Sequence, residues 1–217
     1  QLWFDIVTAY LNNKEDSEMD QDYFLGSIVL SKDNINTKNT LSVVDGQQRL
    51  TTLTILLCVL RDIFSEDEIS EVLKIHIIDQ IGKQSKIKLS THDDNQLKFQ
   101  KNVIEGINFN ISVNHTSDNK YLQNALYFYD LINKSKNPID NDNYIEDFID
   151  FINYLMNNVI LIVIECQNAD SAIKLFHVLN DRGMDLEPSD IIKSHLLNIE
   201  QNDDNRKIII AEWKKIE

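Results

Sequence analysis

The chain is poor in the residues that interrupt regular structure or form disulfides: it has two prolines, five glycines and two cysteines among 217 residues. Scarce proline and glycine favour long helices and strands over a loop-rich β fold. Cys58 and Cys166 lie far apart, each in an apolar run, which is typical of core residues and not of a disulfide framework. No uncharged apolar run reaches the ~18 residues of a membrane span. We therefore expect a cytoplasmic protein without a membrane span.

Positive charge is also scarce, because 21 Lys and Arg face 35 Asp and Glu and give a formal net charge of −14. Binding along a nucleic-acid backbone depends on basic side chains that neutralise phosphates. The composition therefore argues against a general nucleic-acid sleeve and leaves room only for a local basic site. The five histidines lack metal-site spacings such as HExxH, and no GxSxG, GxGxxG or GxxxxGK[ST] motif occurs.

The most informative stretch is residues 41–64, LSVVDGQQRLTTLTILLCVLRDIF. A short β-prone run leads into Asp45-Gly46, and apolar residues spaced by three and four then predict a long helix buried on most sides. Glycine permits a backbone conformation that a side chain forbids, and the N–H groups at a helix start suit an anion. Arg49 would be a second phosphate ligand. The plainer interpretation makes Asp45 an N-cap and Gly46 a turn residue, and both interpretations stay open.

A second polar block lies in residues 171–198, SAIKLFHVLNDRGMDLEPSDIIKSHLLN. A helix is expected to end near Asn180, and a new helix to open at Pro188. One interpretation is a structural helix–turn–helix corner with a weak surface ion pair. The other is that the polar residues converge on the pocket of Asp45 to Arg49; these residues are Asn180, Arg182, Asp190 and Lys193.

Periodicity predicts the remaining elements. Gly26 inside a predicted strand indicates a close backbone approach or a bulge. Residues 72–89 fit a strand pair, but a helix over residues 68–81 fits nearly as well. The run at 159–166 is apolar without alternation and predicts a central strand covered on both faces. The other predicted elements are helices at 1–13, 91–105, 120–134 and 143–157, and a strand at 23–30 that could pair with the strand before Gly46.

These motifs together resemble a known family. LSVVDGQQRLTTL, preceded by YFLGSIVL and followed by KIKLSTHDDNQLKFQ and LFHVLNDRGMDLEPSDIIKSHLL, resembles the N-terminal domain of GmrSD-type proteins, which are modification-dependent (type IV) restriction and phage-defence proteins. The resemblance implies an α+β fold: a small ParB/sulfiredoxin-like mixed sheet, a buried helix after the DGQQR turn, and a mainly helical region. We expect residues 1–90 to form the nucleotide-binding core, truncated at its N-terminus, and residues 91–217 to form the helical region with the buried strand 159–166.

The resemblance also implies a nucleotide site, NTP-hydrolysing in some members of the family. Backbone N–H groups of the turn would hold the phosphates, Arg49 would neutralise charge, and Asp45 would position Mg²⁺ or an attacking water. Asp45 and Arg49 are thus the catalytic candidates, with NTP and Mg²⁺ as ligands. The nucleotide-binding candidates are Gly46, Gln47, Gln48, Arg49 and Thr52, with Asn180, Arg182 and Lys193 as secondary contacts.

In that family a separate C-terminal nuclease domain of the His-Asn-His kind cuts modified DNA. Its signature is absent from this chain, so we expect no DNA cleavage by it, and DNA to be a partner only through the full-length restriction endonuclease. The nuclease domain or subunit is the other expected partner, and a homo-oligomer stays open. The family's Tyr-Gln-Arg segment, upstream of the opening helix, is also absent, which leaves hydrolysis by this fragment open. The alternatives are a non-enzymatic DNA- or protein-binding module with DGQQR as a structural corner, and a ParB-like nuclease.

Overall fold

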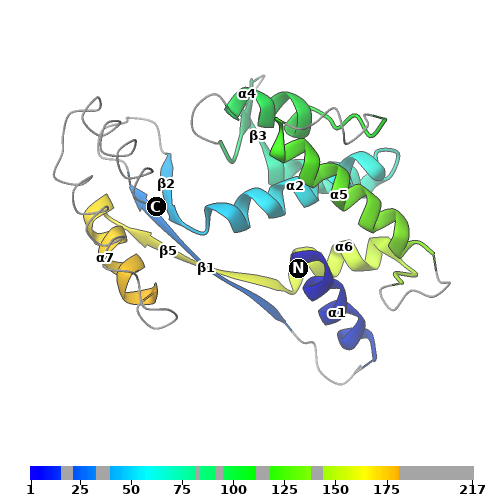
Figure 1. Cartoon of the computed structure of the whole chain (residues 1–217), viewed down its shortest axis with the longest axis horizontal. Coiled ribbons are helices and arrows are strands. Elements are labelled where there is room, and N and C mark those ends of the chain that lie inside the picture. The colour runs from blue at the N-terminus through cyan, green and yellow to red at the C-terminus, as the bar shows by residue number, and fades with distance from the viewer. Residues whose placement is uncertain are drawn as a thin grey trace. The chain divides into compact units, whose positions relative to one another are not determined.

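A computed structural model describes residues 1–15, 22–32, 40–81, 84–90, 95–110, 118–137 and 144–180. Runs of helices are combined with a small number of strands, which confirms the α+β class (Figure 1). The elements are α1 (Leu2–Glu15), β1 (Tyr23–Lys32), β2 (Leu41–Asp45), α2 (Gln47–Ile63), α3 (Glu68–Ile77), β3 (Ile78–Ile81), β4 (Gln84–Ile87), α4 (Asn95–Phe99), the π-helix η1 (Gln100–Ile104), α5 (Lys120–Ser135), α6 (Phe148–Asn157), β5 (Val159–Cys166) and α7 (Ala169–Asn180).

The chain forms two compact units. Unit 1 comprises residues 1–28 and 46–163, and unit 2 comprises residues 29–45 and 164–217. The strands of the described chain form one sheet in the order β2-β1-β5 and a hairpin of β3 with β4. In unit 2, α7 packs against β2. The division into residues 1–90 and 91–217 expected from the sequence differs from these units and stays a prediction.

Helix α2 is the centre of unit 1, where it packs against α3, α5 and η1 (Figure 1). Its C-terminal half is buried, and Leu56, Cys58 and Leu60 have no exposed surface. Its N-terminal half, residues 47–54, is half-buried or exposed. Burial on most sides is therefore confirmed for the second half of the helix only. The first turn of α2 stays accessible from solvent.

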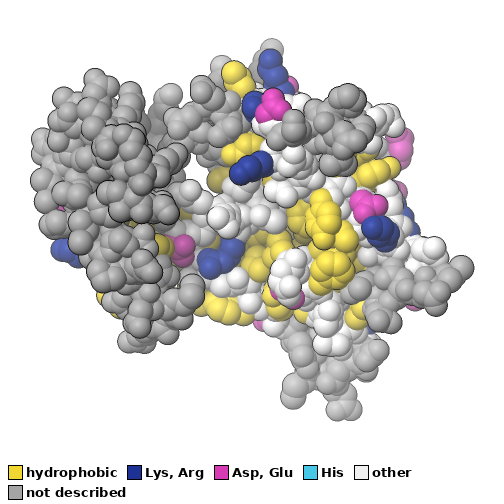
Figure 2. All heavy atoms as spheres, in the orientation of Figure 1, with side chains coloured by type: hydrophobic (Ala, Val, Ile, Leu, Met, Phe, Trp, Pro, Cys, Tyr) yellow, Lys and Arg dark blue, Asp and Glu magenta, His cyan; other side chains and the backbone are white. Residues whose placement is uncertain are grey.

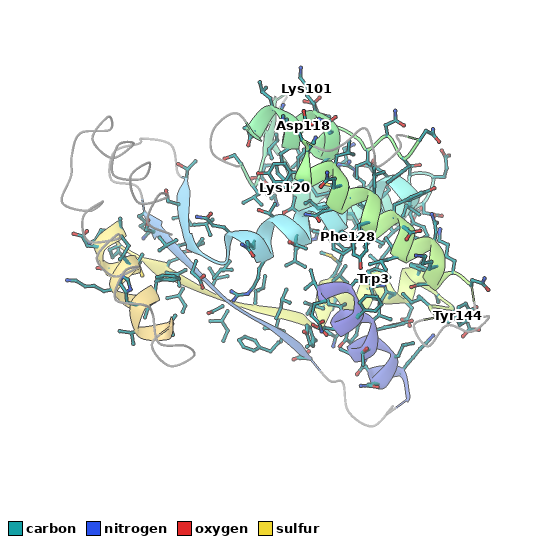
Figure 3. All side chains as sticks on the ribbon, in the orientation of Figure 1. Trp3, Lys101, Asp118, Lys120, Phe128 and Tyr144 are labelled. Carbon is teal, nitrogen blue, oxygen red and sulfur yellow. The ribbon has the colours of Figure 1, made fainter. Side chains whose placement is uncertain are left out.

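Helix α1 is held on α6 by aromatic packing. The Phe151 ring meets Trp3 at 5.4 Å and Tyr10 at 5.3 Å between centroids, both edge-to-face. The Tyr10 hydroxyl donates to Asp150 Oδ2 at 2.9 Å, and burial together with this carboxylate raises the pKa of Tyr10. Figure 3 labels Trp3 and Phe128, which enter the same apolar core from α1 and α5. The N-terminal helix is thus an integral part of the unit 1 core.

Residues 68–89 form a helix followed by a pair of strands, so each of the two predictions holds for a part of this segment. The strand expected from Lys74 is wrong for residues 74–77, which belong to α3. Leu73 and Ile77, one helical turn apart, are 0% and 1% exposed, so burial at helical spacing decided the structure here. The helix does not continue to residue 81 either, because the backbone becomes extended at Ile78 and β3 pairs with β4.

Two other predicted helices differ from the structure in their boundaries. The helix expected at 91–105 is α4 followed directly by the π-helix η1, and residues 91–94 lie outside the described residues. The helix expected from residue 143 begins at Phe148, because the Asp147 side chain accepts from the N–H groups of Ile149 and Asp150 and caps it there.

The strand β5 was expected to be covered on both faces, and this is wrong. It lies at an edge of its sheet. Ile160, Ile162 and Val163 are 39%, 50% and 52% exposed. An apolar run without alternation therefore does not require burial on both faces, because its composition carries no information about which neighbours cover it.

The C-terminal end of α2 carries a buried ion pair. Arg61 donates to both oxygens of Asp62, with Nε–Oδ1 at 2.7 Å and Nη2–Oδ2 at 3.1 Å. It also donates to the carbonyls of Ile104 at 2.8 Å and Val103 at 3.3 Å, at the end of η1. Asp62 in turn accepts from the N–H of Ile107 at 2.8 Å. Burial alone would lower the pKa of Arg61, but its bond and charge interaction with Asp62 raise it overall. The pair satisfies backbone groups that the π-helix leaves unpaired.

Replacing Arg61 should therefore destabilise unit 1 strongly. Arg61→Met removes the donor of two buried carbonyls and leaves the half-buried Asp62 carboxylate with only the Ile107 N–H, and we expect a loss of about 3 kcal/mol in the free energy of unfolding. Urea unfolding followed by circular dichroism measures it. The matched control is Lys134→Met, which breaks an exposed pair with Asp130 and should leave the midpoint unchanged. Equal midpoints for the two variants would contradict a structural role for Arg61.

Candidate functional site

The strands before the DGQQR turn form the expected hairpin. β1 and β2 pair antiparallel, with Val29 opposite Asp45 but Leu30 opposite Val43. Val44 is therefore an extra residue on β2, a β-bulge next to the turn. Bulges commonly occur beside functional sites, where they redirect the strand. Asp45 is the half-buried last residue of β2 and directly precedes Gly46.

Gly46 is the N-cap of α2, so the interpretation of Asp45 as the N-cap is wrong. Its backbone is left-handed, with φ 85° and ψ 12°, and a Cβ added there would lie 2.4 Å from Ile28 Cγ2. Conformation and space thus each require glycine. The first backbone bond of the helix runs from Leu50 N to the Gly46 carbonyl at 3.0 Å. The preceding N–H groups of the first turn consequently have no acceptor within the helix, which makes this end suitable for an anion.

Arg49 lies against β1 at the end of this first turn. A Cβ added to Gly26 would lie 3.2 Å from Arg49 Nε and 3.3 Å from Arg49 Cζ, so the guanidinium occupies the space that a side chain would fill. Gly26 has φ 123°, which an L-residue adopts only with strain. Arg49 Nη1 donates to the Ser27 carbonyl. A close backbone approach or a bulge was expected at Gly26, but the group that lies against it is the side-chain guanidinium of Arg49.

Residues 26 and 28 of a strand point to the same face, and here both meet the first turn of α2. Ile28 abuts Gly46 at the start of that turn, and Gly26 makes room for Arg49 at its end. The glycine inside a strand pattern marks position 26 in the sequence. The sequence does not show that Arg49, 23 positions away, is the residue that lies against it.

For the other predicted site residues the structure gives their exposure or no description. Gln47 and Gln48 are exposed on the first turn, and Thr52 is half-buried one turn after Gln48. Asn180 is the last residue of α7, and its side chain is not described. Arg182, Asp190 and Lys193 lie outside the described residues. Convergence of the second block on the DGQQR turn stays a prediction.

Two observations on the described residues concern metal binding and thiol chemistry. Within it, no three His, Cys, Asp or Glu side chains are grouped so that they could hold a metal ion. Mg²⁺ bound to a nucleotide needs only one or two protein carboxylates, because the phosphates supply other ligands, so Asp45 fits this role. Cys58 has no exposed surface, which confirms that it is a core residue, and burial raises the pKa of its thiol to about 12.

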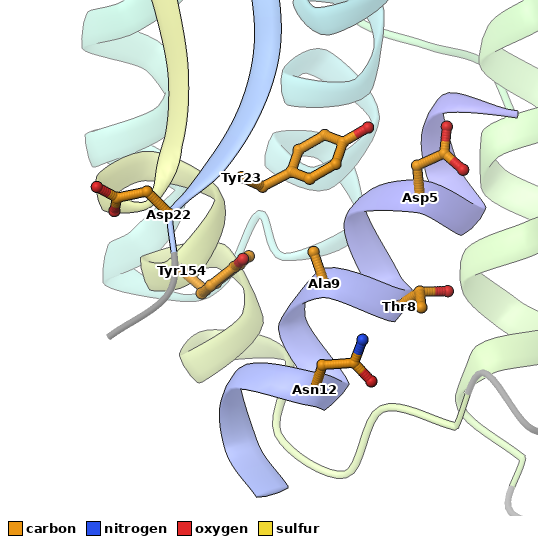
Figure 4. Close-up of a pocket in the computed structure, with 7 residues that line it drawn as sticks. All are labelled: Asp5, Thr8, Ala9, Asn12, Asp22, Tyr23 and Tyr154. Carbon is orange, nitrogen blue, oxygen red and sulfur yellow. The ribbon is translucent and has the colours of Figure 1, made fainter. Parts of the chain in front are cut away.

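Two surface hollows of unit 1 suit phosphate less well than the turn does. One, of about 400 Å³, lies between α1, the start of β1 and the end of α6 (Figure 4). Its lining has two carboxylates and no basic side chain; the residues are Asp5, Thr8, Ala9, Asn12, Asp22, Tyr23 and Tyr154. Burial, with Asp5 nearby, raises the pKa of Tyr23. In the other hollow, of about 590 Å³, Lys136 Nζ already lies 5.2 Å from the Phe64 ring centroid, beside three acidic residues.

The visible basic side chains do not form an extended surface for nucleic acid. On the face in Figure 2, the Lys and Arg side chains of the described residues are scattered among uncharged surface and do not form a continuous stripe. None of the described helices is long and apolar enough to cross a bilayer. The fold and the turn thus define a mixed α+β domain with one anion-suited strand–helix junction.

A family comparison identifies which domain of this class it is. The model of the family "GmrSD restriction endonuclease, N-terminal domain" matches residues 1–197. The chain belongs to this family, as its motifs predicted, and is therefore part of a restriction protein of the phage-defence class. None of the curated proteins matches it.

Gly46 should tolerate substitution less well than another glycine with a positive φ. Gly106 has φ 146° with nothing within 4 Å of an added Cβ, so Gly106→Ala tests backbone strain alone, on the order of 1–3 kcal/mol. Gly46→Ala adds a collision with Ile28, and we expect a further ~1–3 kcal/mol of destabilisation. Urea midpoints of the two variants measure the difference. A Gly46→Ala protein as stable as Gly106→Ala would contradict the close contact with β1.

The two cysteines should differ in reactivity. We expect iodoacetamide at pH 8 to modify the half-buried Cys166 before Cys58, which reacts only after urea unfolding, because Cys58 is buried and stays protonated. Its pKa is raised from 9.0 to about 12 on folding, so its contribution to stability is present below pH 9 and is lost as the pH rises toward 12. Peptide mass spectrometry measures the order. Faster labelling of Cys58 would contradict its burial.

Proposed function

We propose that this chain is the NTP-binding regulatory domain of its restriction protein, and that the first turn of α2 holds the nucleotide's phosphates. The observation that carries the proposal is the junction itself. The first N–H groups of α2 have no acceptor within the helix, as at every helix start. Here that start follows a left-handed glycine, and an arginine of the same turn donates to β1. Membership of the restriction family supplies the biological setting.

Each residue has a definite part in this proposal. The N–H groups of Gln47 to Arg49 donate to phosphate oxygens, and the Arg49 guanidinium neutralises their charge. Asp45 is placed to hold Mg²⁺ or to orient a water. A bound Mg²⁺ would neutralise charge on the β- and γ-phosphates. Phosphoryl transfer depends mainly on positioning and charge, so hydrolysis in the full protein is consistent with these groups.

One observation favours the structural alternative, a DNA- or protein-binding module in which DGQQR only forms a corner. Arg49 already has a structural contact, because it donates to the Ser27 carbonyl. An arginine has five N–H donors, so a bond to one carbonyl does not by itself exclude a ligand-binding role. Measuring nucleotide binding and stability on the same variants separates them.

Thermal melting with each NTP and Mg²⁺ is the direct experiment. A nucleotide present at ~100 times its dissociation constant should stabilise the protein by about 2.7 kcal/mol, which raises the melting temperature by several degrees. We expect Arg49→Ala to abolish the shift. Asp45→Asn should remove the part of the shift that depends on Mg²⁺.

The control for lost positive charge is Lys134→Ala, because Lys134 lies on α5 and pairs with Asp130 at 2.7 Å; it should keep the full nucleotide shift. The structural alternative predicts a different result. Under it, Arg49→Ala lowers the melting temperature, and no NTP changes the melting temperature of either protein. That outcome would overturn the nucleotide-binding proposal.

A further inference from the structure

Three consecutive residues of β1 carry the contact with the DGQQR turn, and none of them belongs to the motif. Gly26 meets the guanidinium of Arg49, the Ser27 carbonyl accepts from Arg49 Nη1, and Ile28 meets Gly46. The contact is specific, since Gly26 has the strained φ of 123° at the point where the guanidinium lies against the strand. Without the space above Gly26 the guanidinium would have to move.

We infer that Gly26 and the Ser27 carbonyl are positioning groups of the phosphate site: they fix the plane of the Arg49 guanidinium, so that the domain distinguishes nucleotides by the number of their phosphates. This inference rests on the proposed NTP site at the same turn. Gly26 itself touches no ligand, and it acts through Arg49.

The physical reason lies in the geometry of arginine. A guanidinium is a planar fork, and it binds two phosphate oxygens only when its plane is correctly oriented. The side chain has several rotatable bonds, so holding it in one orientation costs conformational entropy. The bond to the Ser27 carbonyl and the contact with Gly26 order the Arg49 side chain before a nucleotide binds. Less conformational entropy is therefore lost on binding. Of the three atoms of Arg49 nearest to the position of a Gly26 Cβ, the closest are Nε and Cζ, followed by Nη1 at 3.6 Å.

A lysine at position 49 could not reproduce this arrangement. Its ammonium is a point charge without a plane, so it could satisfy the Ser27 carbonyl or a phosphate oxygen without a fixed relation between them. Arg49→Lys therefore preserves the charge and Gly26 while removing the orientation. Gly26→Ala instead preserves Arg49 and displaces its guanidinium.

The experiment measures dissociation constants of NTP, NDP and NMP of one base, by isothermal titration calorimetry with Mg²⁺. Variants are Gly26→Ala, Arg49→Lys and the control Gly106→Ala, which has strained backbone with open space around it. We expect Gly26→Ala and Arg49→Lys to weaken NTP binding about tenfold, the effect of one charge-assisted hydrogen bond, with NMP binding unchanged. Gly106→Ala should lower stability and leave the NTP-to-NMP ratio unchanged.

A double variant shows whether Gly26 acts through Arg49. In an Arg49→Ala background, Gly26→Ala should cause no further loss of NTP affinity. An additive loss would overturn the positioning role, because it would mean that Gly26 acts independently of the guanidinium. NTP affinity in the double variant is measured separately from stability. A glycine with only a structural role would change the stability and not this affinity.

The outcomes distinguish this inference from the proposed function. If the unsubstituted protein binds NTP and loses it with Arg49→Ala, but Gly26→Ala and Arg49→Lys bind like the original chain, the positioning inference alone is overturned. If Gly26→Ala does not fold, the NTP affinity of Arg49→Lys alone decides: unchanged affinity overturns the positioning inference. If the unsubstituted protein binds no nucleotide, the proposed function and this inference both fail.

Discussion

The close approach of α2 to β1 is the constraint on which the DGQQR turn depends. Gly46 begins the helix with a left-handed backbone beneath Ile28, and Arg49 ends the same turn against Gly26. A side chain at either glycine would meet an occupied position. Because both contacts lie on three consecutive residues of one strand, the turn is fixed at its two ends, and this fixes where the helix start points. A rigid helix start is what an anion site requires, since its donors need no rearrangement on binding.

The same helix is anchored again at its C-terminal end. There Arg61 donates to the carbonyls of Val103 and Ile104 and pairs with Asp62. The two arginines of α2 thus both bind main-chain carbonyls of other elements, but in different surroundings. Arg61 is 8% exposed and serves the core, whereas Arg49 is half-buried beside the accessible first turn. The difference in exposure, and not the chemistry of the side chain, separates a structural arginine from a candidate ligand-binding one.

Membership of the GmrSD N-terminal family gives this local site a context. The overall charge of −14 argues against a domain that wraps nucleic acid.

The sequence by itself determined the family, the α+β class, the long helix after Gly46 and the hairpin before it. These follow from local periodicity, glycine positions and motifs, which are written in consecutive residues. Other features depended on partners distant in the chain. They include the choice of helix over strand at residues 74–77, the exposed face of β5, the N-cap at Gly46 in place of Asp45, and the carbonyls that Arg49 and Arg61 bind. Only the tertiary structure decided these, because burial and hydrogen-bond partners are set by which surfaces meet, and an apolar run or an arginine has the same local pattern whichever surface it meets.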